Sequence, residues 1–343
     1  GPFGYLAEKA STNLAIQSED FTTSWNTNAA TVVANAAVAP DGTTTMDRLA
    51  VTTASGVHGV YQNQSLAAGT NYTASVYMKN DGAGFGGICI GSGNDLSVVV
   101  DLSTGLVTDT HTTGTGVLVA YGCDDVGNGI YRVWVSGNSS APDYIIPFSS
   151  DAAVPSLWEN GRPRYTGVAG EDILIWGAQA ELGTYPTSYI PTTTTAVTRN
   201  GDLLKLADGI VDGSLGTISF EASSGHNYSG ATAHTLLGIY TSNRMFAGNG
   251  INQTGYYPVV GGVVIASGVS RYNTAVQSAM TYNGLDITVY HGSVNTAGTL
   301  PATPMPVQTN PTIGSYIGAY QPDYRFREVK IFDSELTAAE VGD

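Results

Sequence analysis

The chain has 343 residues, which at about 150 residues per domain predicts two domains. Glycine accounts for 43 residues and charged residues for 12%, about half their usual share, a composition typical of short strands and tight turns. The formal net charge of −15 repels phosphate backbones and anionic lipids, so we expect neither nucleic acid nor a membrane as a partner. The same charge disfavours polyanionic glycans unless a cation bridges them.

The cysteine content and the N-terminal sequence exclude further classes of protein. Two cysteines, Cys89 and Cys123, are too few for a disulfide scaffold or a zinc site. The N-terminus lacks the basic and apolar regions of a signal peptide, and Gly1-Pro2 is typical of the remnant of a cleaved tag. We therefore assign residues 1–12 to a tag remnant and leader.

The first half of the chain reads as a series of strands separated by turn signals. We expect strands at Tyr72–Lys79, Leu96–Leu102, Ile130–Ser136 and Asp172–Gln179. Strands at this spacing predict a sandwich or jelly roll over residues 13–199. Two prolines and several threonines in residues 185–195 indicate an extended connection, so we place the domain boundary near residue 200.

The second half of the chain has the same pattern of short predicted strands. We expect strands at Thr217–Ala222, Thr235–Tyr240, Tyr257–Ala266, Gln277–Tyr282, Asp286–Tyr290, Thr312–Ala319 and Tyr324–Phe332. The sequence therefore predicts an all-β protein with two β-sandwich (jelly-roll) domains in tandem, over residues 13–199 and 200–343.

Several motifs in the first half carry a family resemblance. In chain order they are Asn13-Leu14, Gln17 to Phe21, Trp25, Ala39 to Thr44, Tyr72 to Lys79, Val126 to Arg132, Ile175 to Gln179 and Pro186 to Pro191. Together they resemble a carbohydrate-binding-module-like jelly roll that is common in phage tail and head-fibre proteins. The resemblance spans about 190 residues and implies sugar-binding ancestry.

The second half resembles a concanavalin-like or laminin-G-like sandwich. The motif that carries this resemblance is Phe326 to Phe332, with Leu336-Thr337 and Glu340 behind it. A pairing of two such units resembles the host-adhesion parts of phage fibres, which implies recognition of a surface.

The sequence shows no catalytic motif. G-x-S-x-G is absent, the five histidines are scattered, and Glu221 and Glu328 stand alone rather than in the paired arrangement of a glycosidase. Glu171 and Asp172 are adjacent, so on a strand they point to opposite faces. We expect no enzymatic activity and no required cofactor.

A structural calcium ion is the cofactor that the resemblance leaves open. Related jelly rolls often hold calcium at the sandwich edge through an N-terminal acidic residue and a C-terminal Asp. Glu19 and Asp20 match the first element, whereas Trp176-Gly177 replaces the second. The resemblance thus makes Glu19 and Asp20 the candidate metal ligands, with calcium expected to stabilise the domain.

Aromatic side chains are the candidates for sugar contact, because their faces stack on pyranose rings. Period-2 alternation turns Trp134 and Arg132 away from the core on one strand, and Tyr77 and Lys79 on another. These four side chains form either a sugar platform or a face that another strand, loop or protomer covers. Trp158 lies in a loop, as a contact residue or as a plug over a sandwich end.

These observations predict a non-enzymatic structural protein of a phage or prophage particle that recognises a bacterial surface polysaccharide. Other particle proteins are expected partners, and a homotrimer is expected because fibres that resemble this chain are usually trimers. The location implied is the virion surface. Two alternatives stay open: a polysaccharide lyase or glycoside hydrolase of a phage depolymerase, and a particle spacer with no ligand.

Overall fold

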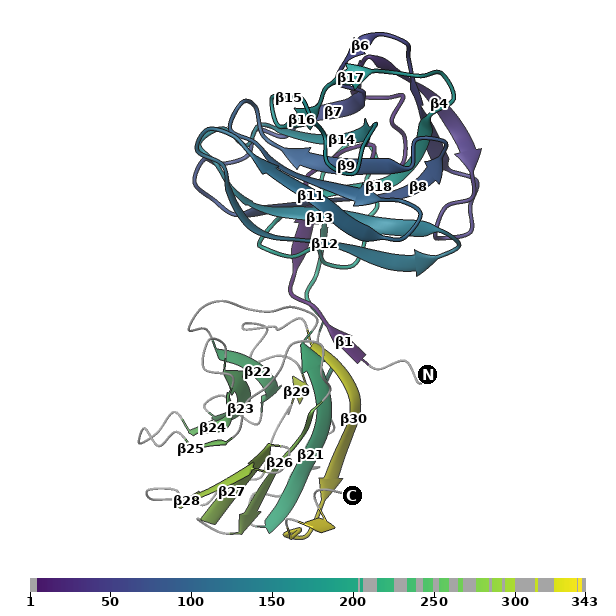
Figure 1. The fold of residues 1–343 in the computed structure, drawn as a ribbon. Coiled ribbons are helices and arrows are strands. Elements are labelled where there is room, and N and C mark those ends of the chain that lie inside the picture. Colours follow the sequence, from purple (N-terminus) through teal and green to yellow (C-terminus); the bar gives the residue numbers. More distant parts are fainter. Residues whose placement is uncertain are drawn as a thin grey trace. The chain divides into compact units, whose positions relative to one another are not determined.

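The structure is a computed structural model that describes residues 5–202 without a break and shorter ranges beyond them. Those ranges are residues 204–205, 215–224, 233–238, 243–248, 253–258, 265–267, 276–283, 286–291, 294–299, 312–313, 324–337 and 339–340. The chain divides into two compact units, of which Ser11–Arg199 is one (Figure 1). The described residues before Ser11 and after Arg199 form the other. The predicted all-β fold class is confirmed, because both units are built from antiparallel sheets.

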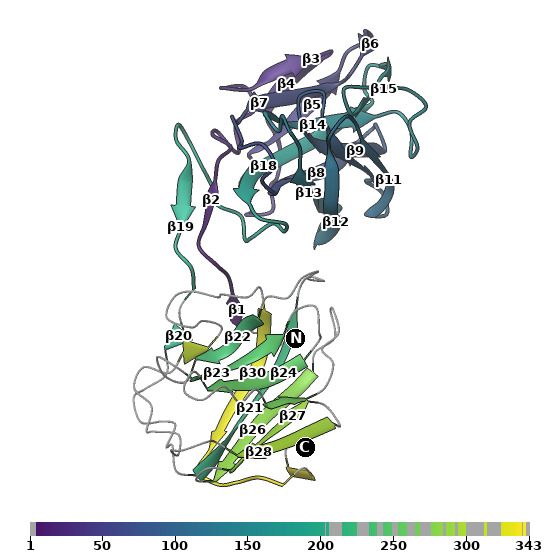
Figure 2. The same ribbon diagram turned by 90° about the vertical axis from the view of Figure 1, so that its left-hand side faces the viewer.

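The unit Ser11–Arg199 contains two six-stranded sheets. From edge to edge the first sheet consists of β11 (Leu106–Thr112), β10 (Leu96–Asp101), β9 (Phe85–Ile90), β14 (Tyr144–Ser150), β7 (Gly59–Asn63) and β3 (Asn26–Asn28). The second consists of β12 (Val117–Gly127), β13 (Ile130–Asn138), β8 (Tyr72–Asp81), β18 (Asp172–Leu182), β5 (Met46–Val51) and β4 (Ala30–Ala37). Three short pairs complete the unit: β15 (Trp158–Glu159) with β16 (Arg162–Pro163), β17 (Tyr165–Thr166) with β6 (Ser55–Gly56), and β19 (Val197–Arg199) with β2 (Ser11–Asn13), the last visible in Figure 2.

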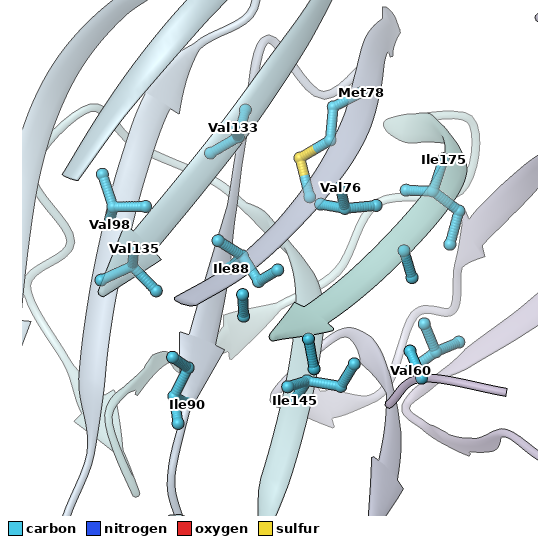
Figure 3. Packing of buried hydrophobic residues seen from close by; sticks show 14 of the residues in the cluster. Val60, Val76, Met78, Ile88, Ile90, Val98, Val133, Val135, Ile145 and Ile175 are labelled. Atoms are coloured by element: carbon cyan, nitrogen blue, oxygen red, sulfur yellow. The ribbon is translucent and has the colours of Figure 1, made fainter. Parts of the chain in front are cut away.

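The main core of this unit lies between the two sheets. Alternation along each strand sends every second side chain inward, which is how Val76 and Met78 come to share one face of β8. In Figure 3 they lie in one cluster with Ile88 of the other sheet, and all three are fully buried. Burying one such side chain stabilises the fold by about 1.5–3 kcal/mol. No helix in the described part of the chain is long and apolar enough to cross a membrane.

Both sheets also bury apolar side chains on the faces that point away from this core. Behind the second sheet lie Ala39, Met46, Tyr77, Ile130, Leu174 and Trp176, with Tyr189 packed on them. Behind the first sheet lie Cys89, Val99, Ile146 and Phe148, with Tyr61, Phe85, Tyr144 and Trp158 packed on them. The loop residue Tyr189 thus covers part of one outer face, and Trp158 of the short strand β15 covers part of the other. This packing decides which of the candidate binding residues stay accessible.

The other unit also contains two six-stranded sheets. One consists of β1 (Tyr5–Ala7), β30 (Tyr324–Phe332), β21 (Leu215–Ser224), β26 (Val276–Asn283), β27 (Asp286–His291) and β28 (Val294–Thr299). The second consists of β20 (Leu204–Lys205), β29 (Thr312–Ile313), β22 (Ala233–Gly238), β23 (Asn243–Gly248), β24 (Gln253–Pro258) and β25 (Ile265–Ser267). The single strand expected at Tyr257–Ala266 is wrong, because β24 ends at Pro258 and β25 begins at Ile265.

Residues 1–12, expected to be a tag remnant and leader, contain two strands. β1 pairs antiparallel with β30, with Tyr5 opposite Phe326 and Ala7 opposite Tyr324 (Figure 1). β2 pairs with β19, with Thr12 opposite Thr198. The backbone groups of these two strands therefore complete sheets of two different units.

The unit Ser11–Arg199 should fold alone. Its two sheets, its core and its terminal strand pair β2–β19 all lie within these residues. Expressed by itself, this segment should unfold in one cooperative transition by calorimetry, with equal calorimetric and van't Hoff enthalpies. A broad, non-cooperative melt would show that the segment depends on the rest of the chain.

Candidate functional site

The predicted sugar platform is covered. Trp134, Tyr77 and Arg132 do turn away from the main core, but they are only 7%, 8% and 8% exposed. The segment 185–190 lies over them. Tyr185 meets the Trp134 ring edge-on at 6.0 Å between ring centroids. The expectation that these three side chains form an open stacking face is therefore wrong, because a sugar cannot reach them.

Hydrogen bonds fasten this covering segment to the sheet. Arg132 donates from Nη1 to the carbonyl oxygen of Thr187 at 2.7 Å. The fully buried carboxylate of Glu181 accepts hydrogen bonds from the backbone N–H of Thr187 and from its hydroxyl, each at 2.8 Å. Gln179 accepts from the backbone N–H of Ile190 at 2.8 Å. The motifs around residues 176–179 and 186–191 are therefore joined by hydrogen bonds, which hold the segment 185–190 against the sheet.

The other two candidate sugar-contact residues are partly accessible. Lys79 is half-buried near the end of β8. Trp158 is also half-buried, and its ring stacks on His111 with 4.1 Å between centroids and 6° between planes. One face of Trp158 is thus already occupied by protein, which favours the plug over the contact residue.

The candidate calcium ligands lie beside a pocket of about 620 Å³ that Gln17, Glu19, Asp20, Asp47 and Thr192 help to line. Glu19 accepts a hydrogen bond from the Tyr189 hydroxyl at 3.0 Å. Asp20 accepts from the hydroxyl of Thr22 at 2.5 Å. Among the described residues no group of three or more His, Cys, Asp or Glu side chains could hold a metal ion. The stabilising calcium ion stays a prediction.

The charges around this pocket are tuned by burial and by hydrogen bonds. Burial raises the pKa of Glu19 above its usual value. Burial likewise raises the pKa of Asp47, whose carboxylate accepts the backbone N–H groups of Phe21 and Asn35 at 2.9 Å each. Partial burial opposes ionisation of Asp20, but hydrogen bonds outweigh it and lower its pKa. These carboxylates already have hydrogen-bond partners within the protein.

A second pocket, of about 330 Å³, lies on the outer face of the first sheet. Its six polar side chains come from five separate places in the sequence: Asn28, Tyr61, Ser92, Tyr144, and Asn160 with Arg162. Gly91 and Gly93 line it with backbone, and Val57 and Ile146 form an apolar floor. We call this the tyrosine–arginine pocket.

The polar side chains of the tyrosine–arginine pocket are almost free of protein partners. Within the described part of the chain, the only hydrogen bond that any of them makes is from Arg162 Nε to the carbonyl oxygen of Glu159, at 3.4 Å. To other described residues, the hydroxyls of Tyr61 and Tyr144 and the side-chain amides of Asn28 and Asn160 make no hydrogen bond. This contrasts with the carboxylates of the larger pocket.

The two tyrosines are held in place by packing rather than by hydrogen bonds. Their rings meet edge to face, with 5.6 Å between centroids and 80° between planes. Both rings are half-buried and pack on the outer cluster that contains Ile146 and Phe148. Each tyrosine is therefore a rigid aromatic anchor with a free polar tip, a combination suited to ligand contact.

Arg162 is positioned by the hairpin of β15 and β16. The turn is Asn160-Gly161, with φ of 48° and 71°, which fits the left-handed conformation that a two-residue hairpin turn requires. The hydroxyl of Ser97 donates to the carbonyl oxygen of Gly161 and fastens the turn to the sheet. Arg164, two residues further, pairs with Glu159 at 2.8 Å. The hairpin thus presents Arg162 to the pocket while Arg164 binds the nearby carboxylate.

Sequence reasoning missed this pocket. Its residues follow no local spacing, because they come from β3, β7, the loop after β9, β14 and the β15–β16 hairpin. The available signal was the Asn-Gly turn between Trp158 and Arg162, which predicts a hairpin that projects a basic residue.

Comparison with known proteins gives only distant similarities. No family model matches the chain, and no curated protein matches it. Among solved structures, the LG4-5 domains of mouse laminin α1 share 8% identity at a TM-score of 0.28, covering 81% of this chain and 87% of that one. A candidate carbohydrate-binding protein of Bacteroides ovatus shares 9% sequence identity at a TM-score of 0.34. The match covers 83% of this chain and 77% of that one. Trypanosoma rangeli sialidase shares 9% sequence identity at a TM-score of 0.32. The match covers 73% of this chain and 47% of the sialidase chain. The fold class of the chain therefore rests on its own strands and sheets.

Proposed function

We propose that the unit Ser11–Arg199 binds a glycan in the tyrosine–arginine pocket. The observation that carries the proposal is the convergence of six polar side chains that, apart from Arg162 Nε, make no hydrogen bond within the described protein. Polar groups that a pocket leaves free are the groups that fix a ligand's orientation. The larger pocket beside Asp47 is a weaker candidate, because its carboxylates are already occupied.

The chemistry of the lining suits a sugar. A pyranose offers apolar C–H faces and a ring of hydroxyls, so it needs aromatic surface with donors and acceptors around it. Tyr61 and Tyr144 supply rings and hydroxyls, Asn28 and Asn160 supply amides that both donate and accept, and Arg162 supplies donors. A volume of about 330 Å³ is near the lower end for a small-ligand site.

We extend the proposal to a non-enzymatic role in a phage or prophage particle, at the virion surface, with a bacterial surface polysaccharide as the ligand. The sequence resemblance of residues 13–199 to jelly rolls of phage fibres supports this placement. No Asp or Glu lines the pocket, whereas glycoside hydrolysis by the usual route needs two carboxylates. In a trimer, several such pockets would hold a cell by avidity.

The proposal is tested by measuring binding of the whole chain to a glycan array and to labelled bacterial cells. Tyr144→Ala removes an aromatic face and a hydroxyl, and should weaken binding at least about tenfold, equivalent to ~1.4 kcal/mol. Tyr144→Phe removes only the hydroxyl and keeps the packing, so a loss of about threefold to tenfold is expected. Tyr121, 46% exposed on the edge strand β12, provides the matched control as Tyr121→Ala.

Two results would contradict the proposal. One is a chain that binds no glycan and no cell. The other is full binding by a folded Tyr144→Ala variant, since the ligand would then lie elsewhere. Release of reducing ends or unsaturated sugars from the polysaccharide would favour the enzymatic alternative instead.

A further inference from the structure

We propose that the ligand of the tyrosine–arginine pocket carries a carboxylate, as a uronic or ulosonic acid residue does, and that Arg162 binds this carboxylate. The inference rests on the proposed glycan binding and names the class of sugar. Its basis is an arginine that faces a pocket with no acidic partner, in a chain of net charge −15.

Among the residues that the structure describes, no carboxylate forms an ion pair with Arg162. The carboxylate nearest to it in the sequence belongs to Glu159, and Arg164 binds that group at 2.8 Å. Arg48 pairs with Asp81 at 2.5 Å, so it too is occupied. Arg162 contributes only its Nε to a weak hydrogen bond, at 3.4 Å, which leaves both terminal nitrogens without a hydrogen-bond partner among the described residues.

A guanidinium with two free terminal nitrogens matches the geometry of a carboxylate. The two groups can form parallel hydrogen bonds, which are stronger than bonds between neutral groups and fix the orientation of the ligand. No described Asp or Glu lines the pocket. The carboxylate of Asp95, behind Gly91 and Gly161, is fully buried and already accepts hydrogen bonds from the backbone N–H of Gly93 at 3.2 Å and the hydroxyl of Thr113 at 2.8 Å. The amides of Asn28 and Asn160 and the two tyrosine hydroxyls then remain for the hydroxyl groups of the sugar.

The overall charge of the protein restricts the ligand further. A net charge of −15 disfavours a densely charged polyanion, whose many charges would each meet the acidic surface. A single carboxylate in the pocket is governed by its local contact, because charges more than about 10 Å away are screened at ~0.1 M salt. The geometry therefore fits a polysaccharide with isolated acidic residues among neutral sugars.

The test uses oligosaccharides that each contain one glucuronic or sialic acid residue, together with the same compounds after reduction of the carboxyl group to an alcohol. Binding to the whole chain is measured by calorimetry at two salt concentrations. The acidic form should bind at least about tenfold more tightly than the reduced form, a difference of ~1.4 kcal/mol. The preference should shrink as salt increases.

Two arginine variants isolate the contribution of the carboxylate contact. Arg162→Gln should lower affinity for the acidic form about tenfold and leave the reduced form within about threefold, which removes the preference. The control is Arg164→Gln combined with Glu159→Gln, which removes both members of the neighbouring exposed ion pair, frees no carboxylate for Arg162, and should leave the preference intact.

The outcomes separate this inference from the proposed function. If reduced oligosaccharides bind as well as acidic ones, and Tyr144→Ala abolishes both, the pocket stands and the acidic ligand is wrong. If Arg162→Gln lowers both forms equally, Arg162 is a general contact and the inference also fails. If neither form binds to any detectable degree, both the proposed function and the inference are overturned.

Discussion

Replacing Asn13 by alanine should lower the free energy of unfolding of the unit Ser11–Arg199 by about 4 kcal/mol. Asn13 is fully buried, and its side-chain nitrogen donates to the carbonyl oxygens of Ala178 at 3.0 Å and Ile190 at 2.8 Å. Its side-chain oxygen accepts the backbone N–H groups of Ala15 and Ala180 at 3.0 Å each. One amide thus satisfies four backbone groups of three segments, and alanine would leave all four buried without partners.

Urea unfolding of Ser11–Arg199, followed by tryptophan fluorescence, measures the effect. The matched control is Asn26→Ala, because Asn26 is exposed on β3. This control should change the free energy of unfolding by no more than about 0.5 kcal/mol. A loss below ~1 kcal/mol for Asn13→Ala would mean that water or a backbone shift replaces the four bonds.

Gly87→Ala should destabilise the same unit by more than about 3 kcal/mol, because no space exists for a methyl group. A Cβ atom at Gly87 would lie 2.0 Å from the carbonyl oxygen of Val98 and 2.5 Å from the ring of Phe148. β9 is paired on both sides, with β10 and β14, so neither neighbour can retreat without breaking a sheet. Only glycine fits at this position, because the carbonyl oxygen of Val98 and the ring of Phe148 leave no room for a side chain.

A calorimetric melt of each variant measures this effect. For a domain of this size, 3 kcal/mol corresponds to a fall in Tm of roughly 6–12 °C. Gly56→Ala makes the same chemical change where the nearest atom would be 3.5 Å away, and should leave Tm nearly unchanged. Equal melting temperatures for the two variants would show that β9 can shift to admit the methyl group.

Period-2 alternation predicted the main core well. Turning Trp134 and Arg132 away from the core assigns Tyr131, Val133 and Val135 to the core face, and all three lie in the buried cluster between the sheets. Ala74 and Val76 on β8 do so as well. Trp25 and Trp176, which lie in motifs of the family resemblance, are also buried, at 7% and 3% exposed. These predictions succeeded because the two faces of a strand differ by geometry alone.

Alternation could not show what covers the opposite face. Trp134 and Tyr77 point away from the main core, as predicted, yet the segment 185–190 covers them. That covering depends on Glu181 and Gln179, which lie on β18 and bind residues 187–190 of the segment that follows it. Tertiary contacts decide that a hydrogen-bonded segment covers the outward aromatic face, and strand periodicity does not predict such contacts.

The pairing of β1 with β30 has a consequence for how the protein is made. Tyr5 must find its place opposite Phe326, so β1 has no partner strand until β30 has left the ribosome. At about 5–20 residues per second, the roughly 320 residues between them take about 16–64 s to synthesise. Ser11–Arg199 can complete its own sheets within this interval. β1 therefore settles late although it is made early, because its partner strand is translated only after the whole of Ser11–Arg199.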